Sequence, residues 1–144
     1  MFKTVILFTL TILCHSCTVK PEPLIMGKDA CYTCKMSLMD QKFGAEIVIK
    51  KGKVYKFDDL NCMINFNNSE FEPSENIAFR VVADFAHPQK LIDATQAFYI
   101  QSEHVKRPMG CHVAAFEKKE DLTTFKKELE GVILDWQELV TQFK

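Results

Sequence analysis

A β-hairpin is the most clearly encoded element of this sequence, and it constrains the fold class. The segment Ala45-Glu46-Ile47-Val48-Ile49-Lys50 alternates in polarity and is rich in β-branched residues. Lys51-Gly52 follows it and leads into Lys53-Val54-Tyr55-Lys56-Phe57. Two such runs on either side of a short glycine-containing turn are typical of paired antiparallel strands. An antiparallel sheet is therefore expected in the fold.

A short helix and several short strands are predicted after the hairpin. Asp58 or Asp59 can cap a helix that runs through Phe66, because a carboxylate there can accept hydrogen bonds from the first free amides of the helix. The polar segment 67–76 is expected to be a loop. Further strands are expected at residues 78–83, 97–101, 113–116 and 132–134.

The C-terminal part of the chain has helical periodicity. Apolar residues fall on one face of the segment 118–130, and Gly131 stands where a helix-terminating glycine is expected. The segment 136–143 has the spacing of a second amphipathic helix. These patterns predict an α+β fold, a single compact domain of short strands and helices. Both halves follow the order Cys/Met motif, strands, helix, which indicates a degenerate repeat.

The N-terminal residues have the features of an export signal. A basic start, Met1-Phe2-Lys3, precedes an apolar run over 5–13 that is shorter than the roughly 20 residues a membrane span requires. Leu13-Cys14-His15-Ser16-Cys17 then resembles a bacterial lipobox, which implies cleavage before Cys17 and lipidation of its thiol. Plain secretion with a free Cys17, or an uncleaved anchor, are the alternatives.

The chain is accordingly divided into three parts. Residues 1–16 are interpreted as a lipoprotein signal peptide, 17–27 as a lipidated extended tether, and 28–144 as one folded domain. The expected location is the cell envelope, on a membrane through the lipid anchor and facing the periplasm. The formal net charge is −1, with 18 basic and 19 acidic residues and no basic stripe, so nucleic acid is not an expected partner.

Two short motifs carry the chemistry. One is Cys31-Tyr32-Thr33-Cys34-Lys35-Met36, and the other is Pro108-Met109-Gly110-Cys111-His112. Thiolates and thioethers are soft ligands that select Cu(I), with Zn(II) as the main competitor among common metals. Behind an export signal, this set suggests a protein that holds copper outside the cytoplasm. No phosphate loop, serine nucleophile elbow or HExxH motif is present in the sequence, so nothing favours an enzyme.

The order of these motifs resembles the NosL family of copper-binding lipoproteins, which are accessory to nitrous oxide reductase. Besides the lipobox, the resemblance rests on residues 29–36, 43–46, 57–63, 108–110 and 114–116. It implies a fold of two ββα-type units and delivery of Cu(I) to a periplasmic cuproenzyme or its ABC-type maturation complex. The family often has glycine where this chain has Lys35. The ligand candidates that the resemblance transfers are Cys34, Met36 and Met109.

Other residues are weighed as additional ligands. Cys31 can ligate the ion or form a disulfide with Cys34. Cys62 is a weaker candidate, since a thiol in a helix is as often a small buried apolar group. Cys111 and His112 are also weaker, because neighbours on a strand point to opposite faces. Met39, Met63, His87 and His104 are interpreted as ordinary structural residues.

Two other functions remain open from the sequence. A thiol–disulfide oxidoreductase would use Cys31 and Cys34, with Pro108 as a facing cis-proline. A structural zinc module would use four thiols, those of Cys31, Cys34, Cys62 and Cys111. The zinc hypothesis leaves the methionines unexplained, and the oxidoreductase hypothesis needs a helix directly after Cys31, where strand and turn are predicted.

Overall fold

The computed structural model describes residues 18–69, 73–106 and 110–143. Its strands form two antiparallel sheets with the orders β2-β1-β3-β4 and β6-β5-β7. The first sheet contains β1 (Ala45–Ile49), β2 (Val54–Phe57), β3 (Ile77–Ala83) and β4 (Leu91–Asp93). The second contains β5 (Phe98–Gln101), β6 (Val113–Phe116) and β7 (Val132–Leu134). The helices are α1 (Leu60–Asn68), the short 3₁₀ turn η1 (Ser74–Asn76), α2 (Lys119–Leu129) and α3 (Trp136–Gln142).

The two halves of the fold repeat one connection. In the first unit a hairpin, β1–β2, leads into α1, and β3 then pairs antiparallel with β1. In the second unit the hairpin β5–β6 leads into α2, and β7 pairs antiparallel with β5. The α+β class and the two-unit plan are thus confirmed, with a third strand added to each ββα unit. No helix among the described residues is long and apolar enough to cross a membrane.

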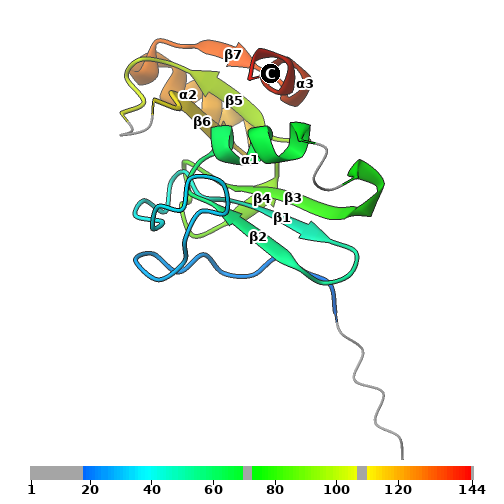
Figure 1. The fold of residues 1–144 in the computed structure, drawn as a ribbon. Coiled ribbons are helices and arrows are strands. Elements are labelled where there is room, and N and C mark those ends of the chain that lie inside the picture. The colour runs from blue at the N-terminus through cyan, green and yellow to red at the C-terminus, as the bar shows by residue number, and fades with distance from the viewer. Residues whose placement is uncertain (1–17, 70–72, 107–109, 144) are drawn as a thin grey trace, which may run out of the picture.

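Strand β1 is buried on both of its faces. Ala45, Ile47 and Ile49 belong to the core cluster that includes α1 side chains, while Glu46 and Val48 point to the opposite face. Figure 1 shows α1 lying across one side of the first sheet, between that sheet and the second unit, while the N-terminal coil follows the other side. The segment before β1 therefore acts as a cover for the sheet.

The N-terminal cover is fixed by charged groups from Glu22 onward, within the segment that was interpreted as a tether. The backbone amide of Glu22 donates to Glu46 Oε1 at 3.0 Å. Lys56, opposite Glu46 in the strand register, forms an ion pair with Asp29 at 2.8 Å. Glu46 is fully buried, and burial raises its pKa to about 7 against the opposing effects of the Glu22 amide and Lys56.

The predicted element boundaries agree with the structure apart from local differences. Asp59, not Asp58, caps α1, and the helix continues to Asn68 into the predicted loop. Strand β4 was not predicted, because Leu91-Ile92-Asp93 contains one β-branched residue, whereas the equally short β7 is wholly apolar and mostly β-branched.

Gly131 has a different role from the one predicted. The left-handed residue that ends α2 is Glu130, with φ of 49°. At Gly131 a Cβ atom would lie 2.3 Å from the carbonyl oxygen of Gln101 on β5. Glycine is needed there because the chain entering β7 approaches the backbone of β5 too closely for any side chain.

Candidate metal site

Three cysteine sulfurs gather at one end of the first unit. Cys31 and Cys34 lie in the loop before β1, and Cys62 lies in the first turn of α1. Their Sγ atoms are all within 4.8 Å of one another, and none of the three forms a disulfide. Cys31 and Cys62 are buried, whereas Cys34 is half-buried, so this thiol group is open to solvent on one side. The donors come from a loop and a helix that are distant in sequence.

The loop that carries Cys31 and Cys34 is a closed turn. Ala30 and Ser37 pair as an isolated antiparallel bridge, and the amide of Cys31 donates to the carbonyl of Met36 at 2.8 Å. Lys35 adopts φ of 65°, a left-handed conformation that glycine reaches without strain. That geometry explains physically why glycine suits this position. The ammonium of Lys35 donates to the carbonyl of Tyr32 at 2.5 Å and lies 4.4 Å from the Tyr32 ring centroid.

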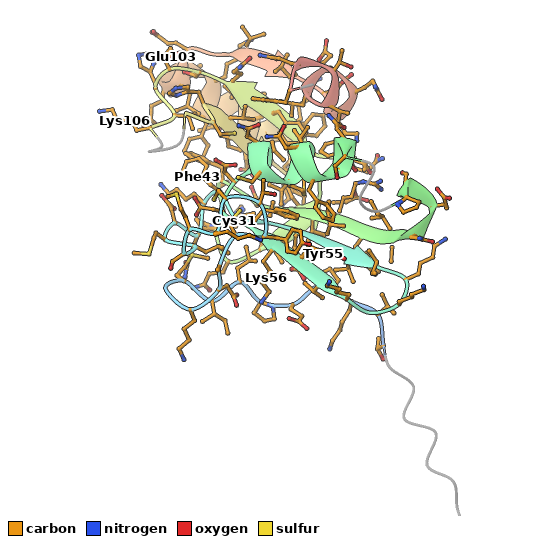
Figure 2. The ribbon with its side chains drawn as sticks, in the orientation of Figure 1. Cys31, Phe43, Tyr55, Lys56, Glu103 and Lys106 are labelled. Carbon is orange, nitrogen blue, oxygen red and sulfur yellow. The ribbon has the colours of Figure 1, made fainter. Side chains whose placement is uncertain are left out.

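The loop is attached to both the sheet and the helix. The amide of Tyr32 donates to the carbonyl of Lys56 on β2, at 2.8 Å. The hydroxyl of Thr33 donates to the carbonyl of Cys62 at 3.1 Å. The ring of Tyr32 packs edge-on against Tyr55, with centroids 4.8 Å apart. Figure 2 shows Cys31 at the edge of the first sheet below α1, and Lys56 on the side that the N-terminal cover follows. These contacts hold the thiols in place.

Hydrogen bonds from the Cys62 thiol and from nearby amides stabilise negative charge on Cys31. Asp59 caps the helix by accepting the amide hydrogen of Cys62 at 2.8 Å. A hydrogen bond from the Cys62 thiol lowers the pKa of Cys31 well below its usual value, and the amides of Asp58 and Cys34 act in the same direction. The same hydrogen bond raises the pKa of Cys62, and burial raises that of Cys34. Cys31 is therefore the cysteine that ionises most readily, and the thiols of Cys62 and Cys34 stabilise its thiolate by hydrogen bonds.

The predicted ligands Met36 and Met109, and the structural residues Met39 and Met63, are found in different situations. Met36 is 43 % exposed, two residues beyond Cys34, and Met39 is 74 % exposed. Met63 is fully buried in the core next to Cys62 in the chain. Met109 lies outside the described residues, as does Pro108, the predicted cis-proline of the oxidoreductase hypothesis.

Cys111 and His112 do not join the thiol group among the described residues. Cys111 is buried in the same core cluster as Cys31 and Cys62, but it is not one of the three donors within 4.8 Å. His112 directs Nδ1 toward the carbonyl of Val105, at 3.1 Å, and Nε2 toward Glu103, at 3.7 Å. Of the four thiols that the zinc hypothesis requires, the structure therefore brings together Cys31, Cys34 and Cys62 but not Cys111.

Comparison with known proteins identifies the family. A family model described as NosL matches residues 23–143. The crystal structure of the copper chaperone NosL from Shewanella denitrificans superimposes with a TM-score of 0.70, covering 84 % of this chain and 96 % of that chain at 18 % sequence identity. No match was found among curated proteins. The match to the family model extends from the N-terminal cover to the end of α3 and includes the whole thiol group, so the chain belongs to the NosL family.

Proposed function

We propose that this protein is a copper(I) chaperone that carries Cu(I) as cargo on the thiol group. The observation that supports this most directly is the convergence of Cys31, Cys34 and Cys62 within 4.8 Å. Sulfur donors are soft and prefer Cu(I) to the harder cations. The cargo is bound and released without a chemical transformation, so no catalytic activity is proposed.

The geometry supports a route for loading and release. Cys31 and Cys62 are buried, while Cys34 is half-buried and Met36 is exposed. An ion held by the deep thiols would therefore be accessible from the side of Cys34 and Met36. Ligands of an acceptor can replace donors one at a time on that side. A thioether also forms no disulfide, which is an advantage in an oxidising compartment.

The proposed ligand set combines two sources. Cys34, Met36 and Met109 come from the family resemblance, and Cys31 comes from the spacing of the motif. Cys62 is added because the structure brings its sulfur to the other two thiols. Met109 is included on the family resemblance alone, because it lies outside the described residues.

The proposed acceptor is a periplasmic cuproenzyme. The resemblance favours nitrous oxide reductase, or the ABC-type complex that matures it. The crystal structure with the same fold is itself described as a copper chaperone. Membership of the NosL family and the exposed side of the thiol group both support transfer by direct contact with such an acceptor.

A parallel titration with copper and zinc tests the proposed function. The reduced domain is expected to bind one Cu(I) far more tightly than Zn(II), because its donors include soft thioethers as well as thiols. Competition against a Cu(I)-specific chelator, with a zinc chelator in parallel, gives both affinities. Zinc binding equal to or stronger than copper binding would contradict the chaperone proposal and favour the structural zinc module.

The membrane anchor is proposed to be a lipid on Cys17. Cys17→Ala is expected to move the protein from the membrane fraction to the soluble fraction, without changing its far-ultraviolet circular dichroism. Several acyl chains anchor firmly because each buried methylene contributes about 0.8 kcal/mol. Cys14→Ala is the matched control and should stay with the membranes. A Cys17→Ala variant that still sediments with membranes would show that the anchor lies elsewhere.

A further inference from the structure

A second group of metal-ligating side chains lies apart from the thiol group. Asp84, His87 and Asp121 each offer one ligand atom, and these atoms are all within 4.8 Å of one another. Asp84 directly follows β3 of the first sheet, and His87 lies in the connection to β4. Asp121 lies in the first turn of α2, in the second unit. The group therefore joins the two units of the fold.

The backbone around this group is held in a defined shape. The amide of Asp84 donates to the carbonyl of Lys90 at 2.9 Å, and the amide of His87 donates to the carbonyl of Asp84 at 3.0 Å. Between them, the amide of Phe85 donates to the carbonyl of Ala115 on β6 at 2.8 Å. The ring of Phe85 packs against that of Phe125 on α2, with centroids 5.5 Å apart. These contacts fix the connection against the helix that carries Asp121.

Protein contacts satisfy Asp84, which pairs with His87 and accepts the amide hydrogen of Ala86, but they leave one oxygen of Asp121 unsatisfied among the described residues. Asp84 is fully buried, and its Oδ2 lies 2.9 Å from Nδ1 of His87. Asp121 Oδ2 is also buried, and within the part of the chain that the structure describes it has no hydrogen-bond partner. The neighbouring Lys90 forms an ion pair with Glu117 instead, at 2.5 Å. A buried carboxylate oxygen without a partner is unfavourable unless a cation or a donor satisfies it.

We propose that Asp84, His87 and Asp121 bind a divalent cation of the zinc type. Two carboxylates balance the charge of such an ion, and the oxygen–oxygen–nitrogen donor set suits Zn(II) or Co(II) rather than Cu(I). Tetrahedral ligands at about 2.0–2.1 Å from zinc lie about 3.3 Å apart, so the separations in the group, all within 4.8 Å, have to close by at most about 1.5 Å. The His87 side chain is 60 % exposed, which leaves it free to adjust and leaves a position open to water. The ion would tie the connection after β3 to α2.

Cobalt(II) is the probe for the experiment, because it distinguishes the two groups spectroscopically. Thiolate ligands give Co(II) an intense charge-transfer absorption in the near ultraviolet, whereas nitrogen and oxygen ligands do not. Ions bound to the reduced full chain are counted by equilibrium dialysis with Co(II) and, separately, with Zn(II). We expect one equivalent of Co(II) that adds no thiolate absorption and that Zn(II) displaces.

Two variants test whether this equivalent of Co(II) is bound by the Asp84, His87 and Asp121 group. His87→Gln is expected to weaken it at least tenfold and to leave any thiolate absorption unchanged, and Asp121→Asn should do the same. His104→Gln is the matched control, because His104 also lies in a loop but directs Nδ1 toward the carbonyl of Leu129. Circular dichroism confirms folding of each variant. The proposal is wrong if every bound ion is accompanied by thiolate absorption, or if His87→Gln and Asp121→Asn bind like the parent protein. Neither result depends on whether the thiol group carries copper.

Discussion

Cys62→Ser should weaken Cu(I) binding at least tenfold, which corresponds to about 1.4 kcal/mol of binding free energy. The Cys62 sulfur lies within 4.8 Å of the sulfurs of Cys31 and Cys34, and a hydroxyl is a hard donor that Cu(I) does not favour. Cys62 also supports the low pKa of Cys31, so its loss removes a ligand and makes the remaining thiolate less available. Competition with a Cu(I) chelator under reducing, oxygen-free conditions measures the change.

Substituting Cys31 and Cys34 separately shows how much each loop thiol contributes to Cu(I) binding. The family resemblance predicts that Cys34→Ser weakens binding more than Cys31→Ser, because it places the functional thiol at Cys34, near Met36. The lowered pKa of Cys31 predicts the opposite order, so comparing the two variants shows which thiol is the main ligand. Cys111→Ala is the matched control, since Cys111 is buried in the same core cluster but is not among the three close donors. If Cys62→Ser binds copper like the parent protein while Cys34→Ser does not, the helix thiol is a packing residue and the ligand set is confined to the loops.

Met109→Leu tests whether the second motif reaches the same ion. Leucine and methionine have similar volumes, so the substitution should leave the fold nearly intact while it removes the thioether. Binding at least tenfold weaker would assign Met109 to the site. Unchanged binding would exclude Met109 from the site, and the ligand set would then consist of the three thiols and Met36.

The buried carboxylate of Glu46 should make the protein less stable as the pH rises. Its pKa is about 7 in the folded state and has an ordinary value of 4.5, so the folded protein binds the proton more tightly than the unfolded chain does. The contribution of this proton is fully present below pH 4.5 and is lost as the pH rises through 7. Between about pH 5 and about pH 8 the expected loss is about 2–3 kcal/mol. Urea unfolding at the two pH values measures it.

Glu46→Gln isolates this effect from other titrating groups. Glutamine can still accept the amide hydrogen of Glu22 but does not ionise, so the variant should lose most of the difference between the two pH values. Glu75→Gln is the control, because Glu75 is exposed in η1 and is not among the groups that shift the pKa of Glu46. Equal pH dependence in the parent protein and in Glu46→Gln would show that Glu46 does not titrate in this range.

The sequence predicted the fold where the information is local. The hairpin of β1 and β2 follows from β-branched residues around Lys51-Gly52, and α3 follows from apolar spacing over two turns. Strand β4 could not be predicted, because Leu91-Ile92-Asp93 has weak β propensity and its position depends on pairing with β3. The burial of Glu46 was also not predictable, since it results from the N-terminal cover crossing the sheet.

The candidate site was predictable only in part, for a related reason. Cys31, Cys34 and Met36 stand together in the sequence, and their spacing alone suggests soft-metal chemistry. That Cys62 completes the thiol group depends on how α1 packs over the loop, which no local pattern encodes. The grouping of His87 with Asp84 and Asp121 is likewise tertiary, because it joins the two units and leaves no motif in the chain.

The docking of Glu22 on the first sheet limits how far the domain can move from a membrane. If Cys17 carries the lipid, only five peptide units separate the anchor from Glu22, which is at most about 18 Å of extended chain. The first sheet would then remain close to the lipid headgroups, with the second unit on the side of α1 directed away from them (Figure 1). Copper transfer would take place in a thin layer above the membrane surface. A diffusing acceptor would have to enter that layer, whereas a membrane-embedded acceptor would meet the chaperone by lateral diffusion.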